Sequence, residues 1–195
     1  MLTKQETEAI FRETGAMLTG HFQLTSGLHS DRYFQCALVL QHPQHTAALC
    51  QELARRFAGL DAVTVVGPAV GGIIVAYEMG RALGVRSIFT ERENGVLTLR
   101  RGFTLTPGEK VLVVEDVITT GGSVRETIDA VRAQGGEVVG VGVLVDRSNG
   151  ALDFGVKTEA LLVTEAIAYQ PDDCPLCGQG QPAVKPGSRQ ITNKT

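Results

Sequence analysis

Residues 110–123 of the chain are Lys110-Val111-Leu112-Val113-Val114-Glu115-Asp116-Val117-Ile118-Thr119-Thr120-Gly121-Gly122-Ser123. The apolar run at 110–114 predicts a strand buried on both faces, as in a parallel sheet. Two adjacent carboxylates, Glu115 and Asp116, leave the end of this strand. Small residues follow, and then apolar residues at helical spacing predict a helix that ends at Gly135-Gly136. Ligands of open α/β sheets bind beyond the carboxyl ends of strands, so we expect a binding site here.

The loop at 119–123 has the composition of a phosphate site. Its glycines allow close approach of the backbone, its three hydroxyl side chains add donors, and the start of a helix offers free N–H groups. The sequence lacks the Gly-Lys-Ser/Thr of a Walker A loop and the Gly-x-Gly-x-x-Gly of a dinucleotide-binding turn. Carboxylates can accept hydrogen bonds from sugar hydroxyls. An acidic pair followed by this loop therefore predicts a site for a phosphorylated ribose.

Strands and helices alternate over much of the chain, which predicts an α/β fold with a mostly parallel central sheet flanked by helices. The capping box formed by Thr3 and Glu6 predicts a first helix that ends near Thr14. Asn94-Gly95 predicts a hairpin turn. The further predicted elements are extended segments at 20–27 and 33–40, helices from 43 to Gly59 and at 72–83, hairpin strands at 86–92 and 96–101, strands at 63–66, 138–145 and near 160–163, and an irregular final stretch of about twenty residues.

The length of 195 residues predicts a single domain. We divide it into an N-terminal element (about 1–40), a core (about 43–168) and an irregular tail (about 170–195). The net charge of −3 gives no field that favours nucleic acid or an anionic membrane. No apolar run approaches a membrane span, the N-terminus has no signal-peptide core, and four cysteines are too few for a secreted disulfide framework. We therefore expect a cytoplasmic protein with reduced thiols.

The stretch at 113–123 resembles the signature of type I phosphoribosyltransferases, which bind 5-phosphoribosyl-1-pyrophosphate. Further segments resemble the orotate-using members of that family. Residues 21–30, with Tyr33-Phe34, are similar to their N-terminal hood, and residues 67–72 to their pyrophosphate loop. Arg147, after Val145-Asp146, matches their orotate-contacting arginine, and residues 172–177 are similar to their tail.

The resemblance implies the type I phosphoribosyltransferase fold and transfer of a 5-phosphoribosyl group to orotate, with release of pyrophosphate, in pyrimidine (UMP) biosynthesis. It implies Mg²⁺ as cofactor and a homodimer. We expect Asp116, Arg92 and Arg100 to be catalytic, and Thr119 and Arg147 to contact orotate. The residues expected to bind the phosphoribosyl donor are Glu115, Asp116, Val117, Ile118, Thr119, Thr120, Gly121, Gly122 and Ser123.

Two positions depart from the orotate-using pattern. Many members have lysine in the pyrophosphate loop, where this chain has Gly71, and another in the hood, where it has Thr25. We hypothesise that Arg92, Arg100 and Arg101 take over part of the contact with pyrophosphate, because arginine is suited to bidentate phosphate binding.

Two alternatives remain at this level: a purine or uracil phosphoribosyltransferase with the same donor loop, and a regulator that senses the donor without turnover. Cys174 and Cys177 form half of a zinc motif with no second pair at suitable spacing, so we predict an ordinary turn and no metal ligands. We expect His21 and His29, within the hood-like segment, to be structural or solvent-facing.

Overall fold

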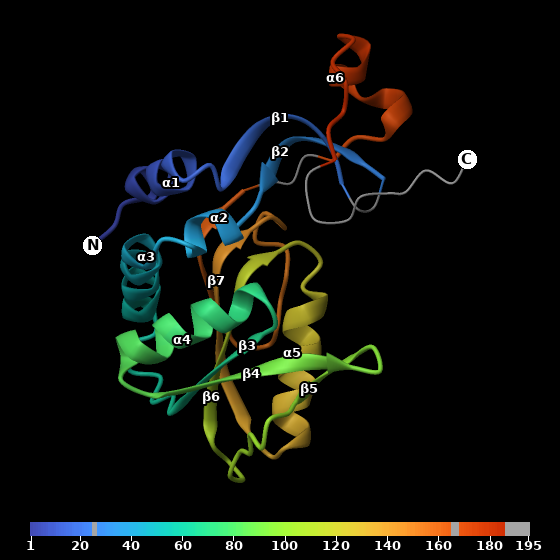
Figure 1. The fold of residues 1–195 in the computed structure, drawn as a ribbon. Coiled ribbons are helices and arrows are strands. Elements are labelled where there is room, and N and C mark those ends of the chain that lie inside the picture. Colours follow the sequence, from blue (N-terminus) through green and yellow to red (C-terminus); the bar gives the residue numbers. More distant parts are fainter. Residues whose placement is uncertain (25–26, 165–167, 186–195) are drawn as a thin grey trace.

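The computed structural model describes residues 1–24, 27–164 and 168–185, and its centre is a six-stranded sheet of order β5-β4-β3-β6-β7-β8 (Figure 1). All neighbouring strands in this sheet are parallel except β4 and β5, which form an antiparallel hairpin. The strands are β3 (Thr64–Pro68), β4 (Arg86–Glu93), β5 (Val96–Leu99), β6 (Lys110–Ile118), β7 (Glu137–Asp146) and β8 (Lys157–Val163).

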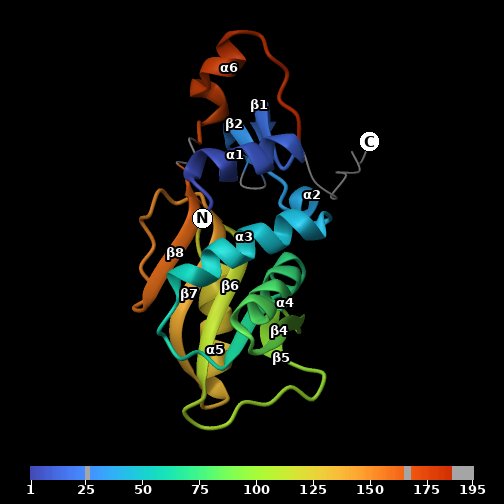
Figure 2. The same ribbon diagram turned by 90° about the vertical axis from the view of Figure 1, so that its left-hand side faces the viewer.

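The helices cover both faces of this sheet, with α3 and α4 on one face and α5 on the other (Figure 2). The α-helices in the described residues are α1 (Lys4–Glu13), α2 (Ala37–Leu40), α3 (Pro43–Arg56), α4 (Gly71–Leu83), α5 (Gly122–Ala133) and α6 (Pro175–Gly178), and a 3₁₀ turn spans Pro171–Asp173. Among the described residues no helix has both the length and the apolar character needed to cross a membrane.

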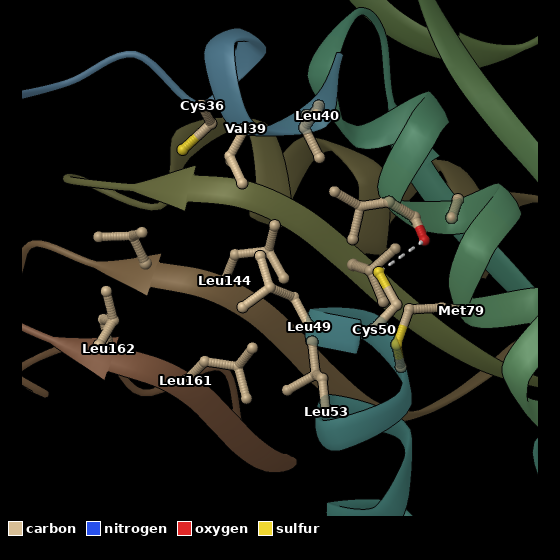
Figure 3. Close-up of a cluster of buried hydrophobic side chains, with 14 of the residues drawn as sticks. Cys36, Val39, Leu40, Leu49, Cys50, Leu53, Met79, Leu144, Leu161 and Leu162 are labelled. Atoms are coloured by element: carbon tan, nitrogen blue, oxygen red, sulfur yellow. Dashed lines mark hydrogen bonds between the residues drawn. The ribbon is translucent and has the colours of Figure 1, made fainter. Parts of the chain in front are cut away.

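Strand β6 is buried from both sides, as its continuous apolar run predicts. Leu112 and Val114 belong to the core cluster under α3 and α4, and Val111 and Val113 to the cluster under α5. Figure 3 shows the first cluster, in which side chains from α3 and α4 meet those of the central strands. Each Å² of apolar surface removed from water stabilises a fold by about 25 cal/mol. These two clusters, which hold most of the buried apolar side chains, are therefore the main source of the stability of the fold.

A second, two-stranded antiparallel sheet is formed by β1 (Met17–Gln23) and β2 (His29–Phe34). Together with α1 and α2 it makes up the hood, residues 1–40. The hood lies at one end of the central sheet, and α6 lies on the far side of β1 and β2 from that sheet (Figures 1 and 2).

Several local predictions are confirmed. Thr3 and Glu6 form a reciprocal capping box at the start of α1. The helix predicted at 72–83 is α4 (Gly71–Leu83), and Gly84 follows it in the left-handed conformation. Asn94 and Gly95 both have positive φ and join β4 to β5, as a two-residue hairpin turn of this kind requires.

Three local predictions are wrong. Residues 37–40 form the helix α2 rather than a strand, because this short apolar run buries Val39 and Leu40 through one helical turn, and period alone does not separate the two states. Strand β6 continues to Ile118, four residues beyond the predicted end, because β7 pairs with it over that length. The tail contains a 3₁₀ turn and α6 within residues 171–178, while residues 186–195 lie outside the described part.

The strand order has one consequence for function. From β3 the chain builds the sheet outward through β4 and β5, and from β6 it builds in the opposite direction through β7 and β8. The connections therefore diverge between β3 and β6. Open α/β sheets bind ligands in the crevice at such a switch point.

Candidate active site

The acidic pair lies near the carboxyl end of β6, beside the switch point. Glu115 is buried, and its Oε1 accepts a hydrogen bond from the backbone N–H of Asp116 at 3.1 Å. Asp116 Oδ1 accepts one from the N–H of Val117 at 2.9 Å. Burial, and then the neighbouring charge of Asp116, raise the pKa of Glu115, and burial also raises the pKa of Asp116. The pair is therefore short of positive partners and suited to a cationic or hydroxyl-bearing ligand.

The loop after β6 forms a cavity of about 210 Å³ in front of α5. Gly121 has φ +74°, and a Cβ there would lie 2.9 Å from the Phe154 ring, so glycine is required for this turn. No side chain in the described residues caps the start of α5. The cavity is lined by residues 117–124 and by Glu115, Arg92 and Glu126. The loop therefore forms the predicted concave site at a helix N-terminus, where an anion is favoured.

The loop after β3 packs directly against the acidic pair. A Cβ on Gly71 would lie 2.4 Å from Asp116 Oδ2, and one on Gly72 would lie 3.1 Å from Glu115 Oε1. Residue 71 therefore has no room for a side chain in this conformation. The lysine that the family resemblance leads one to expect at this position cannot be added without displacing the Asp116 carboxylate or the loop.

Arg147 directly follows β7 and is buried. Its backbone N–H donates to the carbonyl of Ile118 at 2.9 Å, which joins it to the end of β6. Its Nη2 atom is buried and has no hydrogen-bond partner among the residues that the structure describes. Burial lowers the pKa of Arg147, partly offset by Tyr33 and Cys36 of the hood. A buried guanidinium nitrogen without a partner is suited to an anionic ligand.

The turn that carries Arg147 is held by Asp146. One carboxylate oxygen accepts hydrogen bonds from the N–H and hydroxyl of Ser148, at 2.7 and 2.6 Å, and the other from the N–H of Gly150 at 3.1 Å. These contacts fix the backbone direction after β7.

The three candidate pyrophosphate-binding arginines lie on the β4–β5 hairpin or just after it, and each pairs with a glutamate. Arg92 forms a bidentate pair with Glu126 at 2.9 and 3.0 Å. Arg101 pairs with Glu91, and Arg100 with Glu93 at 3.3 Å. Only Arg92 lines the phosphate-loop cavity within the described structure.

The structure thus brings Arg92, Arg147 and residues 115–123 together at the carboxyl ends of the central strands. Thr25 lies outside the described residues. Glu126 was not predicted as a site residue, although it lies one turn into α5, directly after the phosphate loop, and lines the cavity. It also missed Cys36, whose Sγ lies 3.8 Å from the carbonyl oxygen of Asp116.

Cys174 and Cys177 have no second pair at suitable spacing in the sequence, but the structure places His21 and His29 beside them. No local signal links these two pairs, which are about 150 residues apart.

The sheet order, the acidic pair and the phosphate loop define a type I phosphoribosyltransferase. The family model of the phosphoribosyl transferase domain matches residues 38–157.

Curated relatives narrow this class. The orotate phosphoribosyltransferase of Pelotomaculum thermopropionicum is 70% identical over 97% of this chain and 100% of its own length. That of Heliobacterium modesticaldum is 59% identical, over 96% and 100%. The chain belongs to the orotate phosphoribosyltransferase family.

Solved structures agree with this assignment. Orotate phosphoribosyltransferase from Aeropyrum pernix superposes with a TM-score of 0.67 at 26% identity, over 80% of this chain and 92% of that one. The Mycobacterium tuberculosis orotate phosphoribosyltransferase in complex with inorganic phosphate gives a TM-score of 0.66 at 27% identity, over 82% and 94%.

The raised pKa of Glu115 predicts a pH-dependent cost in stability. The Glu115 carboxyl has its ordinary pKa near 4.5 in the unfolded chain and a raised pKa in the folded protein, so folding loses stability as the pH rises above about 4.5. Glu115→Gln removes that loss and keeps an oxygen for the Asp116 N–H. We expect the variant to melt about 3–6 °C above the unchanged protein at pH 8, and equally with it at pH 4, where the carboxyl is protonated in both states.

Thermal unfolding at the two pH values measures this difference. Glu13→Gln, at an exposed position on α1, is the matched control. Equal melting temperatures for Glu115→Gln and the unchanged protein at both pH values would contradict a raised pKa for Glu115 in the folded protein.

Proposed function

We propose that this chain transfers the 5-phosphoribosyl group of 5-phosphoribosyl-1-pyrophosphate to N1 of orotate, giving orotidine 5′-monophosphate and pyrophosphate, as a step of pyrimidine biosynthesis. The observation that carries the choice of orotate is Arg147, a buried cation whose Nη2 lacks a partner in the described structure. Orotate is a pyrimidine with a carboxylate, and a planar guanidinium pairs with a carboxylate through two parallel hydrogen bonds. The 70% identity to a curated orotate phosphoribosyltransferase supports the same choice.

The base would lie between the core and the hood. Tyr33 and Cys36, at the inner end of the hood, interact electrostatically with Arg147. Cys36 also reaches the backbone of Asp116. A ligand held by Arg147 in this space would have its ring near the end of β6, where Thr119 follows. We therefore assign orotate to Arg147 and Thr119.

The donor would lie along residues 115–123. The cavity formed by 117–124 would hold the 5′-phosphate through the N–H groups at the start of α5 and the hydroxyls of Thr119, Thr120 and Ser123. Glu115 and Asp116 would accept hydrogen bonds from the ribose hydroxyls. Cleavage at an anomeric carbon develops positive charge on the sugar, and the adjacent carboxylates would stabilise that charge in a site built in advance. Holding phosphate and hydroxyls together sets the position of the reacting carbon.

The donor would enter with Mg²⁺, which neutralises the charge of the pyrophosphate as it leaves. The donor set fits this ion, because Mg²⁺ prefers oxygen ligands and the acidic pair supplies two carboxyl groups whose pKa values are raised by burial, an effect that a nearby cation would offset. Arg92, with Arg100 and Arg101, would add positive charge on the pyrophosphate side.

We further propose that the protein acts in the cytoplasm as a homodimer. Its four free cysteines fit a reducing compartment. The dimer follows from the family resemblance, in which the segment corresponding to the hairpin arginines reaches the partner's site.

The direct test of the function incubates the purified protein with donor, Mg²⁺ and one base at a time, and follows orotate by its ultraviolet absorbance. We expect orotate to be consumed, and adenine, hypoxanthine and uracil to be left. Consumption of one of these bases but not orotate would instead establish another base specificity. Donor binding without product from any base would identify a donor-sensing regulator.

Loss of the Arg147 guanidinium should affect orotate selectively. Removing one partner of a buried charge pair costs about 2–3 kcal/mol, so Arg147→Gln should raise the KM for orotate about 30- to 150-fold. The KM for the donor should change little. The preference for orotate over uracil, which lacks the carboxylate, should shrink, and a merely structural role would not produce that result. Arg132→Gln, exposed on α5, is the control.

Substitution of the hairpin arginines should weaken binding of the donor. We expect Arg92→Ala, Arg100→Ala and Arg101→Ala each to raise the KM for the donor several-fold, most strongly for Arg92, because it lines the cavity. The effect should diminish at high salt, since these side chains are exposed. Steady-state kinetics with Arg132→Ala as control measure the change, and unchanged kinetics in all three variants would refute the role.

A further inference from the structure

Four potential metal ligands meet where the tail crosses the outer end of the hood. His21 comes from β1, His29 begins β2, Cys174 precedes α6 and Cys177 lies within it. One nitrogen or sulfur atom from each lies within 4.8 Å of all the others. His21, His29 and Cys174 are buried and Cys177 is exposed, so the cluster is enclosed but has one open side.

Four of the distances in this cluster are within about 0.4 Å of those between the corners of a zinc tetrahedron. Zn–N bonds of about 2.0–2.1 Å and Zn–S bonds of about 2.3 Å place N and N about 3.3 Å apart, and N and S about 3.6 Å apart. His21 Nε2 lies 2.9 Å from His29 Nδ1, 3.5 Å from Cys174 Sγ and 3.8 Å from Cys177 Sγ. Cys177 Sγ lies 3.3 Å from His29 Nδ1.

A second observation concerns the orientation of the His21 ring. Its Nδ1 lies 2.8 Å from the backbone carbonyl of Gln181, an acceptor, so this nitrogen carries the proton. The lone pair is then on Nε2, the atom that faces the two sulfurs and His29. Histidines that bind metals typically donate their other ring N–H to a carbonyl in this way.

We propose that His21, His29, Cys174 and Cys177 bind one Zn²⁺ ion in a closed structural site that fastens the tail to the outer end of the hood. Two thiolates and two neutral imidazoles around Zn²⁺ have no net charge, which suits a buried position. Four protein ligands complete the coordination of Zn²⁺ and leave no position for a substrate. The sheet formed by β1 and β2 lies between α6 and the central sheet that carries the acidic pair (Figures 1 and 2). The ion is thus separate from the Mg²⁺ of the reaction.

The fold gives a reason for such a site. A two-stranded sheet is marginal by itself in water. The described tail contacts the outer end of this two-stranded sheet through two isolated β-bridges, Phe22 with Val184 and His29 with Tyr169. The helix α6 has four residues and no buried member in its own span. Cross-linking by a metal supplies stability that so small an apolar interface cannot.

The first experiment measures metal in the full-length protein, purified in reducing buffer without chelator and after addition of Zn²⁺ and desalting. Elemental analysis should find about one zinc per chain. Cys174→Ser with Cys177→Ser should lower the zinc content at least about tenfold. Cys50→Ala, at a core cysteine outside the cluster, should retain zinc. A chelator should lower the melting temperature of the unchanged protein and leave that of the double variant unaltered.

The second experiment uses Co²⁺ as a spectroscopic probe. The unchanged protein should show the visible bands of four-coordinate Co²⁺ and a near-ultraviolet sulfur-to-metal band. His29→Ala should weaken binding. His29→Cys should restore it with a stronger sulfur band, because three cysteines and one histidine also form a zinc site. This exchange distinguishes a metal site from a cluster held only by hydrogen bonds.

Three results would each overturn the proposal: substoichiometric zinc in the unchanged protein even after Zn²⁺ is added, zinc retained by the double serine variant, or failure of His29→Cys to bind Co²⁺ when the unchanged protein does so. A Cys174–Cys177 disulfide in the protein as purified, seen as a mass increase of about two hydrogens on reduction, would also overturn it.

Discussion

The pairing of β6 with β3 on one side and β7 on the other is the constraint on which the rest of the structure depends. β6 pairs with β3 only as far as Val66 opposite Val113, but with β7 as far as Ile118 opposite Asp146. Past Val113 the two central strands therefore separate while β6 continues. At this opening the acidic pair has a neighbouring strand, β7, on one side only. The loop after β3 covers the pair on the other side so closely that a Cβ on Gly71 would lie 2.4 Å from Asp116 Oδ2.

The site that results holds acidic and basic groups that do not pair with one another in the described structure. Glu115 is buried and Asp116 is half-buried, both with raised pKa values, and Arg147 is buried with an unpartnered nitrogen. The acidic pair lies near the end of β6 and the guanidinium follows β7, so burial favours the neutral form of each group until a ligand binds. Each is costly to bury, and the cost is recovered when a ligand of complementary charge binds. Such preorganisation at the expense of stability is typical of catalytic sites.

The sequence was sufficient to predict what depends on neighbours along the chain. Strand β6, its acidic pair, the phosphate loop and α5 follow one another without interruption, and so do the Asn94-Gly95 hairpin and the Thr3 capping box. The helix at 37–40 was not predictable from its apolar run, because its state is set by what it packs against. The pairing of Arg92 with Glu126 was also missed, since it joins a hairpin to a helix 34 residues later.

The same reasoning explains why the His–Cys cluster has no sequence signal. His21 and Cys174 are 153 positions apart, and only the folding of the tail back over the hood brings them together. The inner end of the hood depends on other contacts, because Phe34 and Cys36 belong to the main core cluster with Phe11 of α1. The two ends of the hood are therefore held by different forces. Apolar packing fixes the inner end, which faces Arg147, and the tail holds the outer end. A change at the cluster should loosen the outer end while leaving the environment of Arg147 in place.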